Sequence, residues 1–426
     1  MGMKLVRSLS IILMISITFS FPTLRGQGQQ RTRTGESEIT FFSKEETKWT
    51  DKREIPLPVV MGQGVKEEPW MGSFDLREDA ISPMMKMSPS TTVPGCGYSG
   101  KFTRSVAEMV GGDKALYEEG RYQYFEGKYE GALSSFQKLI QSYPVSPWAG
   151  SALYWMGESK FHQGKDDEAY GYFYRVVEDY PGNEFYPAGL YSCGWIQLKK
   201  GDYESGYGFF RRVFDANPDH AIAESSLFWA GYCLYYLGRY PETLHEMETL
   251  LQKYPTGKWR PEAEYLMGVS YFRLQKFMEA VTLFKTFWKQ YPRHPLIEST
   301  RYALAWSLTG LEQYPEGRKT FEDLLLDYPG TRLSDPIFWG IIKTCLGMGE
   351  MERALYLQQR FLSSFLSSPW MEQVSFDMGQ YYFDKKEFGN AAATFRRFLR
   401  TYPENALQEW VYFMLGESLF SQKEYA

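Results

Sequence analysis

The sequence predicts an all-α fold, built from helical hairpins that repeat every 37 residues. Tyr-Pro pairs recur at this interval, columns of small residues follow the same interval, and aromatic residues make up 17% of the chain while Val and Ile are sparse. The composition favours packed helices over a sheet. A chain of 426 residues is too long for one compact core, so a repeat array is a natural expectation.

The Tyr-Pro pairs mark the end of each repeat. Proline disfavours helix at the residue before it and cannot donate a backbone hydrogen bond, so each pair is expected to end a helix. Every interval is 37 residues or a multiple of it, which identifies a repeat architecture. The pairs begin at Tyr143, Tyr180, Tyr254, Tyr291, Tyr328 and Tyr402, and Asn217-Pro218 fills one gap.

Three further columns predict two close-packed helices in each repeat. Small residues on both helices let the backbones approach, and an aromatic residue fills the space beside them. The first column is Gly120, Gly157, Gly194, Gly231, Gly268, Ala305, Ile342, Gly379 and Gly416. Twelve residues later the second is Ala132, Ala169, Gly206, Thr243, Ala280, Gly317, Ala354 and Ala391, and four residues further the third is Phe136, Phe173, Phe210, Met247, Phe284, Phe321, Gln358 and Phe395. Glycines that suit a left-handed C-cap end the first helix at Gly127, Gly164, Gly201, Gly238 and Gly349.

This pattern resembles the tetratricopeptide (TPR) repeat, extended from its usual length to 37 residues. Gly157, Ala169, Phe173 and Pro181 have the spacing of that family. The stretch from Tyr154 to Pro181 is similar to the exported subgroup that contains the Tol-Pal-associated cell-division coordinator and the outer-membrane assembly lipoprotein BamD. The resemblance implies a right-handed superhelix whose concave groove, lined by first helices, binds protein segments. No lipobox cysteine and no N-terminal heptads are present, so neither identity transfers.

Three regions are expected along the chain. Lys4 and Arg7 precede an uncharged run that is shorter than a membrane span, so residues 1–20 are predicted to be a signal peptide, with an N-terminal anchor as the alternative. Residues 21–112 are polar, lack periodicity and are predicted to be a flexible spacer. Residues 113–426 form the solenoid of eight full hairpins and an incomplete ninth.

Two repeats depart from the pattern. The seventh has Ile342 in the glycine column and Gln358 in the aromatic column, which predicts wider helix packing or a hinge over residues 335–371. The ninth has a first helix only, so apolar residues such as Tyr412, Phe413 and Phe420 lack the second helix of their own hairpin. Because repeat arrays need polar ends, this predicts that the chain is a fragment or docks at this end.

These residues are not expected to form a catalytic, metal or cofactor site. The four histidines lie in different repeats and the four cysteines form no CxxC pair, so no metal site and no cofactor are predicted. The cysteines are expected to be small buried apolar residues. The net charge of −5 argues against nucleic acid, and basic clusters such as Arg396, Arg397 and Arg400 are interpreted as solvated helix faces. The prediction is a non-enzymatic chain, unless a catalytic domain follows Ala426.

A partner-binding groove is predicted in repeats two to six. Aromatic residues that occur at one position in only some repeats are not required by the fold, and aromatics and arginine commonly anchor interfaces. The alternative is that these rings thicken the packing between successive first helices. On the binding hypothesis, replacing Trp195 and Trp229 by alanine should hardly change melting. The candidate residues are Trp155, Trp195, Trp229, Tyr232, Tyr236, Arg273 and Trp306.

The predicted function is a protein-interaction scaffold, exported to the periplasm or envelope of a bacterium, that acts in outer-membrane assembly, cell division or transport. Its partners are envelope proteins, and membrane contact is limited to the signal or anchor segment. The alternative is a glycan- or peptidoglycan-binding module in which the same aromatic groove stacks sugars.

Overall fold

The structure, a computed structural model, describes residues 112–365, 368–405 and 407–422. These residues form seventeen α-helices and no strand, which confirms the all-α solenoid of helical hairpins. The predicted signal peptide at residues 1–20 and the predicted spacer, up to residue 111, lie outside the described residues. No helix among the described ones is long and apolar enough to cross a lipid bilayer.

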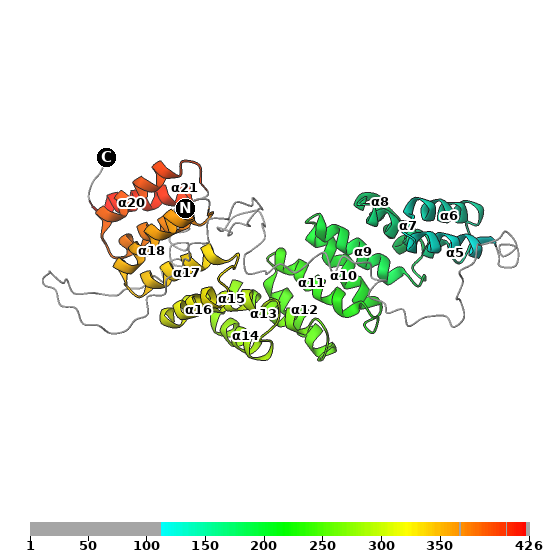
Figure 1. The fold of residues 1–426 in the computed structure, drawn as a ribbon, viewed down its shortest axis with the longest axis horizontal. Coiled ribbons are helices and arrows are strands. Elements are labelled where there is room, and N and C mark those ends of the chain that lie inside the picture. Colours follow the sequence, from blue (N-terminus) through cyan, green and yellow to red (C-terminus); the bar gives the residue numbers. More distant parts are fainter. Residues whose placement is uncertain (1–111, 366–367, 406, 423–426) are drawn as a thin grey trace, which may run out of the picture. The chain divides into compact units, whose positions relative to one another are not determined.

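Each helix has 14 residues, and first and second helices alternate along the chain (Figure 1). The first helices are α5 (Gly112–Phe125), α7 (Ala149–His162), α9 (Tyr186–Lys199), α11 (Ala223–Tyr236), α13 (Arg260–Arg273), α15 (Ile297–Gly310), α17 (Ser334–Gly347), α19 (Met371–Asp384) and α21 (Gln408–Ser421). The second helices are α6 (Tyr129–Ser142), α8 (Asp166–Asp179), α10 (Tyr203–Ala216), α12 (Tyr240–Lys253), α14 (Phe277–Gln290), α16 (Tyr314–Asp327), α18 (Met351–Ser364) and α20 (Phe388–Thr401).

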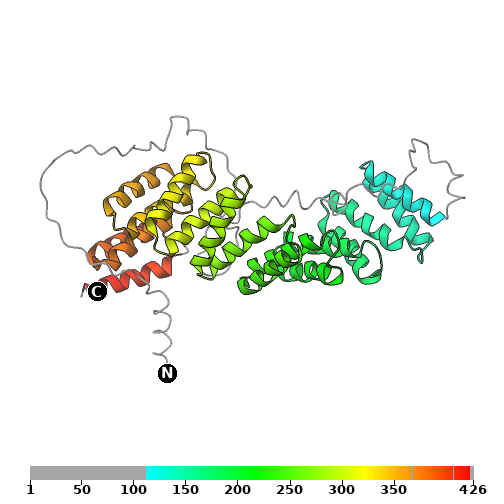
Figure 2. The same ribbon diagram turned by 90° about the horizontal axis from the view of Figure 1, so that it is seen from below.

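The chain divides between Tyr328 and Pro329 into two compact units. Among the described residues, the unit before this point holds the six hairpins from α5 to α16, and the unit after it holds α17 to α21. Within each unit consecutive helices pack side by side, as both views show (Figures 1 and 2). In α21, Tyr412, Phe413 and Phe420 are each more than half exposed.

Helix ends follow the residues that cannot continue a helix. Most second helices end one residue before the Tyr-Pro pairs, where tyrosine leaves the helical conformation, as at Tyr143 with a φ of −136° and a ψ of 64°. After the first helices, the glycines expected at the C-cap have positive φ angles of 73° to 79°. Three hairpins adopt this left-handed conformation without glycine, at Gln275, Glu312 and Lys386.

The glycine column is explained by the aromatic column of the same hairpin. A Cβ added to Gly157 would lie 2.6 Å from Cε1 of Phe173, and one added to Gly268 would lie 2.5 Å from Cε1 of Phe284. The ring of the second helix therefore rests on the bare backbone of the first. The seventh hairpin, α17 and α18, instead buries Ile342 and Gln358 at these positions. Its first helix therefore has a larger side chain than glycine, and its second helix has no ring at the facing position. The hinge over residues 335–371 stays a prediction.

Neighbouring hairpins are joined by a second recurring contact, which the sequence analysis missed. The residue directly before each following first helix is large, apolar and mostly buried, and in several hairpins it stacks on the aromatic of the preceding first helix. Ring centroids are 4.9 Å apart in Tyr117–Trp148, 4.7 Å in Tyr154–Phe185, 4.6 Å in Phe228–Trp259 and 4.4 Å in Trp339–Trp370. Tyr117 and Tyr154 occupy the same position in successive first helices, and this stacking is their role.

In the turn before most first helices, a side chain accepts a hydrogen bond from the backbone N–H of the residue two positions later. This geometry lets a local side chain replace the backbone partners that the turn lacks. The acceptors differ in type but occupy one column: Ser146, Asn183, His220, His294, Thr331, Ser368 and Asn405, with distances of 2.8 to 3.3 Å. Where the column has Gly257, the carboxylate of Glu224 from α11 accepts the bond from the Trp259 amide at 2.7 Å.

Gly268→Ala and Gly416→Ala should have different effects although both sit in the glycine column. The methyl group added at position 268 would force Phe284 out of place, so we expect a loss of about 1–3 kcal/mol in the free energy of unfolding. Position 416 has no atom within 4 Å of an added Cβ, so helix propensity alone predicts a change between zero and a gain of about 1 kcal/mol. Urea denaturation followed by circular dichroism measures both. Equal effects would contradict the ring-on-glycine explanation.

Candidate partner-binding surface

Four of the seven candidate side chains meet in one ring cluster on α9 and α11. Trp195 of α9 packs edge-on against Trp229 of α11 with centroids 4.6 Å apart, and Trp229 contacts Tyr232 at 5.2 Å. Tyr232 lies 4.8 Å from Tyr236, and their hydroxyls are 3.2 Å apart. We call these four residues the aromatic cluster. It spans two consecutive first helices.

The other candidates lie beside different neighbours. The Trp155 indole Nε1 donates to the Tyr117 hydroxyl at 3.1 Å and so joins α7 to α5. Trp306 packs within its own hairpin, 5.4 Å from Phe321. The Arg273 Nε lies 3.4 Å from the Tyr235 hydroxyl, and burial lowers the pKa of the guanidinium, which still stays charged at neutral pH.

Exposure separates the candidates into two groups. Trp155 and Trp229 are 0% exposed, whereas Trp195 and Tyr232 are 7% exposed and Tyr236 is 9% exposed, as is Trp306. The packing interpretation accounts for the burial of the rings, and in this structure no ring of the candidate set offers an open face on which a sugar would stack. Arg273 is partly exposed and is the charged residue of the candidate set. Partner contact stays a prediction.

Trp259 is the residue of this region that the sequence analysis missed. It stacks on Phe228 and lies 5.6 Å from Trp229, so it supports the aromatic cluster from the turn before α13. Its signal was available: the apolar residues at Trp148, Phe185, Ile222, Trp259, Leu296, Leu333, Trp370 and Leu407 recur every 37 residues.

The histidines and cysteines have structural surroundings. His220 and His294 accept backbone bonds in the turns described above, and His162 stacks on Tyr129 with centroids 5.3 Å apart. Among the described residues no cluster of three potential metal ligands occurs. Cys193, Cys233 and Cys345 are buried thiols, as expected, and burial raises the pKa of Cys193 and Cys233 so that both stay protonated.

Acidification should weaken the turn at His220. Burial lowers the pKa of His220 below its ordinary value of 6.5, and its Nδ1 must be unprotonated to accept the Ile222 amide. The unfolded chain therefore binds the proton more readily, and stability is lost as pH falls below about 6.5. His220→Asn keeps an acceptor, as Asn183 does in another hairpin, and does not titrate.

The measurement is the melting temperature between pH 7.5 and 5.5. His220→Asn should melt close to the wild type at the higher pH and lose less than the wild type at the lower pH. An identical loss in both proteins would remove His220 as the cause.

Burial reverses the earlier expectation for Trp229→Ala. Removing a side chain with no exposed surface leaves a cavity, so we expect a loss of about 3–5 kcal/mol of stability. Trp410→Ala in α21, where the side chain is nearly half exposed, is the control and should cost less. Thermal melts of the two variants and the wild type compare them; an unchanged melt for Trp229→Ala would show that the core does not need this ring.

Two protein-family models match the chain. A tetratricopeptide repeat model matches residues 117–184. The YfiO model, described as outer membrane lipoprotein and similar to BamD, matches residues 220–332 and 342–426. Both are families of non-catalytic protein-interaction scaffolds. No curated protein matches the chain at a significant level.

Several solved repeat proteins are similar to parts of the chain. A tetratricopeptide repeat protein from Parabacteroides merdae is 19% identical, with a TM-score of 0.48, over 63% of this chain and 98% of that one. MamA from Desulfovibrio magneticus is 16% identical, with a TM-score of 0.37, over 43% and 97%. YrrB, described as a TPR protein with an unusual peptide-binding site, is 18% identical, with a TM-score of 0.38, over 45% and 93%.

Proposed function

We propose that this chain, whose residues 117–184 match a tetratricopeptide repeat model, is a protein-interaction scaffold of the bacterial cell envelope, which holds segments of partner proteins along its first helices. The match of residues 220–332 and 342–426 to an outer membrane lipoprotein family supports the envelope location. Outer-membrane assembly is the process in best agreement with this match, ahead of division and transport.

The aromatic cluster is the observation that carries the binding role. It brings two indoles and two phenols from consecutive first helices into contact, and Trp195, Tyr232 and Tyr236 each keep 7 to 9% of their surface exposed. Tyrosine, tryptophan and arginine are the residues that most often anchor protein interfaces. The hydroxyl groups of Tyr232 and Tyr236 suit hydrogen bonds to the backbone of a bound segment, while Trp229 supports the cluster from the core.

Site-specific photocrosslinking tests this proposal in cells that export the protein. A benzoylphenylalanine at position 236 replaces one aromatic ring by another and should capture a protein partner. The same group at position 248, an exposed residue of the second helix α12, is the matched control. We expect at least roughly fivefold more adduct at position 236, because anchors concentrate binding at a small part of a surface.

Mass spectrometry of the adducts separates the possible outcomes. One envelope protein enriched at position 236 supports the scaffold. Peptidoglycan fragments in place of protein would support the glycan-binding alternative, and equal adducts at both positions would contradict a binding surface on the first helices.

A further inference from the structure

Gln358 of α18 is the polar member of a column that is otherwise apolar. The other hairpins have Phe or Met at this position, and Ile342 of the same hairpin supplies apolar volume. Gln358 is only 4% exposed, and its Nε2 is buried without a hydrogen-bond partner. Buried amide groups are almost always bonded, because an unbonded one loses its hydration with nothing in return. The amide therefore indicates a ligand.

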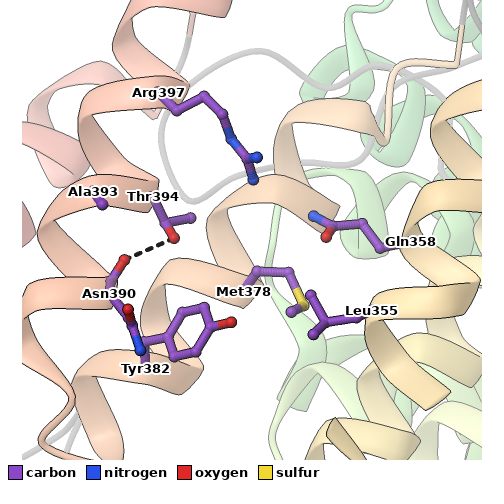
Figure 3. A pocket seen from close by; sticks show the side chains of 8 residues that line it. All are labelled: Leu355, Gln358, Met378, Tyr382, Asn390, Ala393, Thr394 and Arg397. Atoms are coloured by element: carbon purple, nitrogen blue, oxygen red, sulfur yellow. Dashed lines mark hydrogen bonds between the residues drawn. The ribbon is translucent and has the colours of Figure 1, made fainter. Parts of the chain in front are cut away.

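A pocket of about 340 Å³ lies at this amide, between α18, α19 and α20. Leu355 and Gln358 come from α18, Met378 and Tyr382 from α19, and Thr394 and Arg397 from α20. Figure 3 shows the amide end of Gln358 and the guanidinium of Arg397 pointing into the same space from opposite sides. The site involves only residues of the unit after Pro329 and is separate from the aromatic cluster.

Three side chains that line this pocket, Gln358, Tyr382 and Arg397, can donate hydrogen bonds into it. The Thr394 hydroxyl donates to the Asn390 carbonyl at 2.8 Å and is occupied. Arg397 is exposed, and within the described part of the chain it forms no ion pair. Burial raises the pKa of Tyr382, so its hydroxyl stays protonated at neutral pH. A cation, an amide N–H and a phenol beside the apolar Leu355 and Met378 suit a carboxylate on a short apolar stem.

The arginines beside the pocket favour the same ligand. Helices α18 and α20 together carry five arginines and one glutamate. Helix α19, which also lines the pocket, carries Glu372, Asp377 and Asp384 and no basic residue, but Asp377 is buried and accepts from Trp339 and Lys343. Exposed arginines such as Arg396, Arg397 and Arg400 attract acidic partners and raise their rate of association.

We propose that this pocket binds a glutamate side chain of an acidic protein segment. The carboxylate accepts from the Gln358 amide and from Arg397, and the two methylene groups pack on Leu355 and Met378. The neighbouring arginines attract the rest of the segment. The scaffold then has two binding surfaces of different chemistry, one aromatic and one for acidic segments.

Fluorescence anisotropy of labelled peptides with the full chain tests the pocket. The probe is Gly-Glu-Leu-Glu-Gly with a labelled N-terminus and an amidated C-terminus. One comparison peptide has both glutamates replaced by glutamine, and a second has the same glutamines and a free C-terminal carboxylate. We expect the glutamate peptide to bind at least about tenfold more tightly than either comparison peptide.

Two pairs of measurements locate the site. Arg397→Gln should weaken binding about tenfold, whereas Arg396→Gln, the exposed neighbour outside the pocket, should change it by less than about twofold. Gln358→Met, which copies the residue found at Met247, should weaken binding and raise the melting temperature, because it removes an unbonded amide from the core.

The proposal is overturned by any of four results. These are no preference for glutamate over glutamine, tighter binding of the free C-terminal carboxylate, equal losses in Arg396→Gln and Arg397→Gln, or a Gln358→Met variant that melts lower and binds the probe unchanged. The last result would assign Gln358 to packing alone.

Discussion

The contact between an aromatic ring on one helix and a glycine on the other determines the geometry of the hairpins. The ring of Phe173 occupies the place where Gly157 would otherwise carry a Cβ, and the same relation holds for Phe284 and Gly268. It fixes how closely the two helices approach and which of their residues face each other. The small residues of the second column, such as Ala169 and Ala280, are then completely buried between the helices. In the seventh hairpin Ile342 and Gln358 keep the helices paired, but leave a polar group in the core.

Joining the hairpins requires different contacts at each junction. A stacked pair such as Tyr154 and Phe185 recurs at several junctions. The rest of the space between successive first helices is filled by different side chains at each junction. Between α9 and α11 it is filled by Trp195 and Trp229, and between α5 and α7 by Trp155. In the unit after Pro329 the corresponding space is polar: Asp377, almost fully buried, accepts from Trp339 at 2.7 Å and Lys343 at 2.9 Å. Such a buried carboxylate is tolerated because its donors replace water.

The periodicity predicted the helical hairpins well, but it did not separate binding residues from residues that pack between hairpins. The second helices end at the positions that the Tyr-Pro pairs predicted, as at Ser142 before Tyr143, because proline excludes helix at the residue before it. The turn acceptors were not recognised from the sequence, because four residue types can fill this position. Serine, asparagine, histidine and threonine each provide a side-chain atom that accepts the same backbone hydrogen bond. Aromatics present in only some repeats were taken for binding residues, yet Trp229 shows that packing between hairpins also varies along the chain. Nothing in the sequence distinguishes Arg397 from Arg396; only their positions on α20 relative to α18 do.

The carboxylate of Glu224 has a consequence for how the array comes apart. In most hairpins the turn is held by a side chain two residues before the amide it binds, so it forms without help from a neighbour. At Trp259 the acceptor belongs to α11, and Gly257 leaves the space that it needs. A charge-assisted hydrogen bond therefore joins the fourth and fifth hairpins. If α11 of the fourth hairpin unfolds, the turn before α13 of the fifth loses its hydrogen-bond acceptor. In a solenoid whose stability is a sum over neighbours, such a link raises the cooperativity of unfolding in the middle of the first unit, where the aromatic cluster also lies.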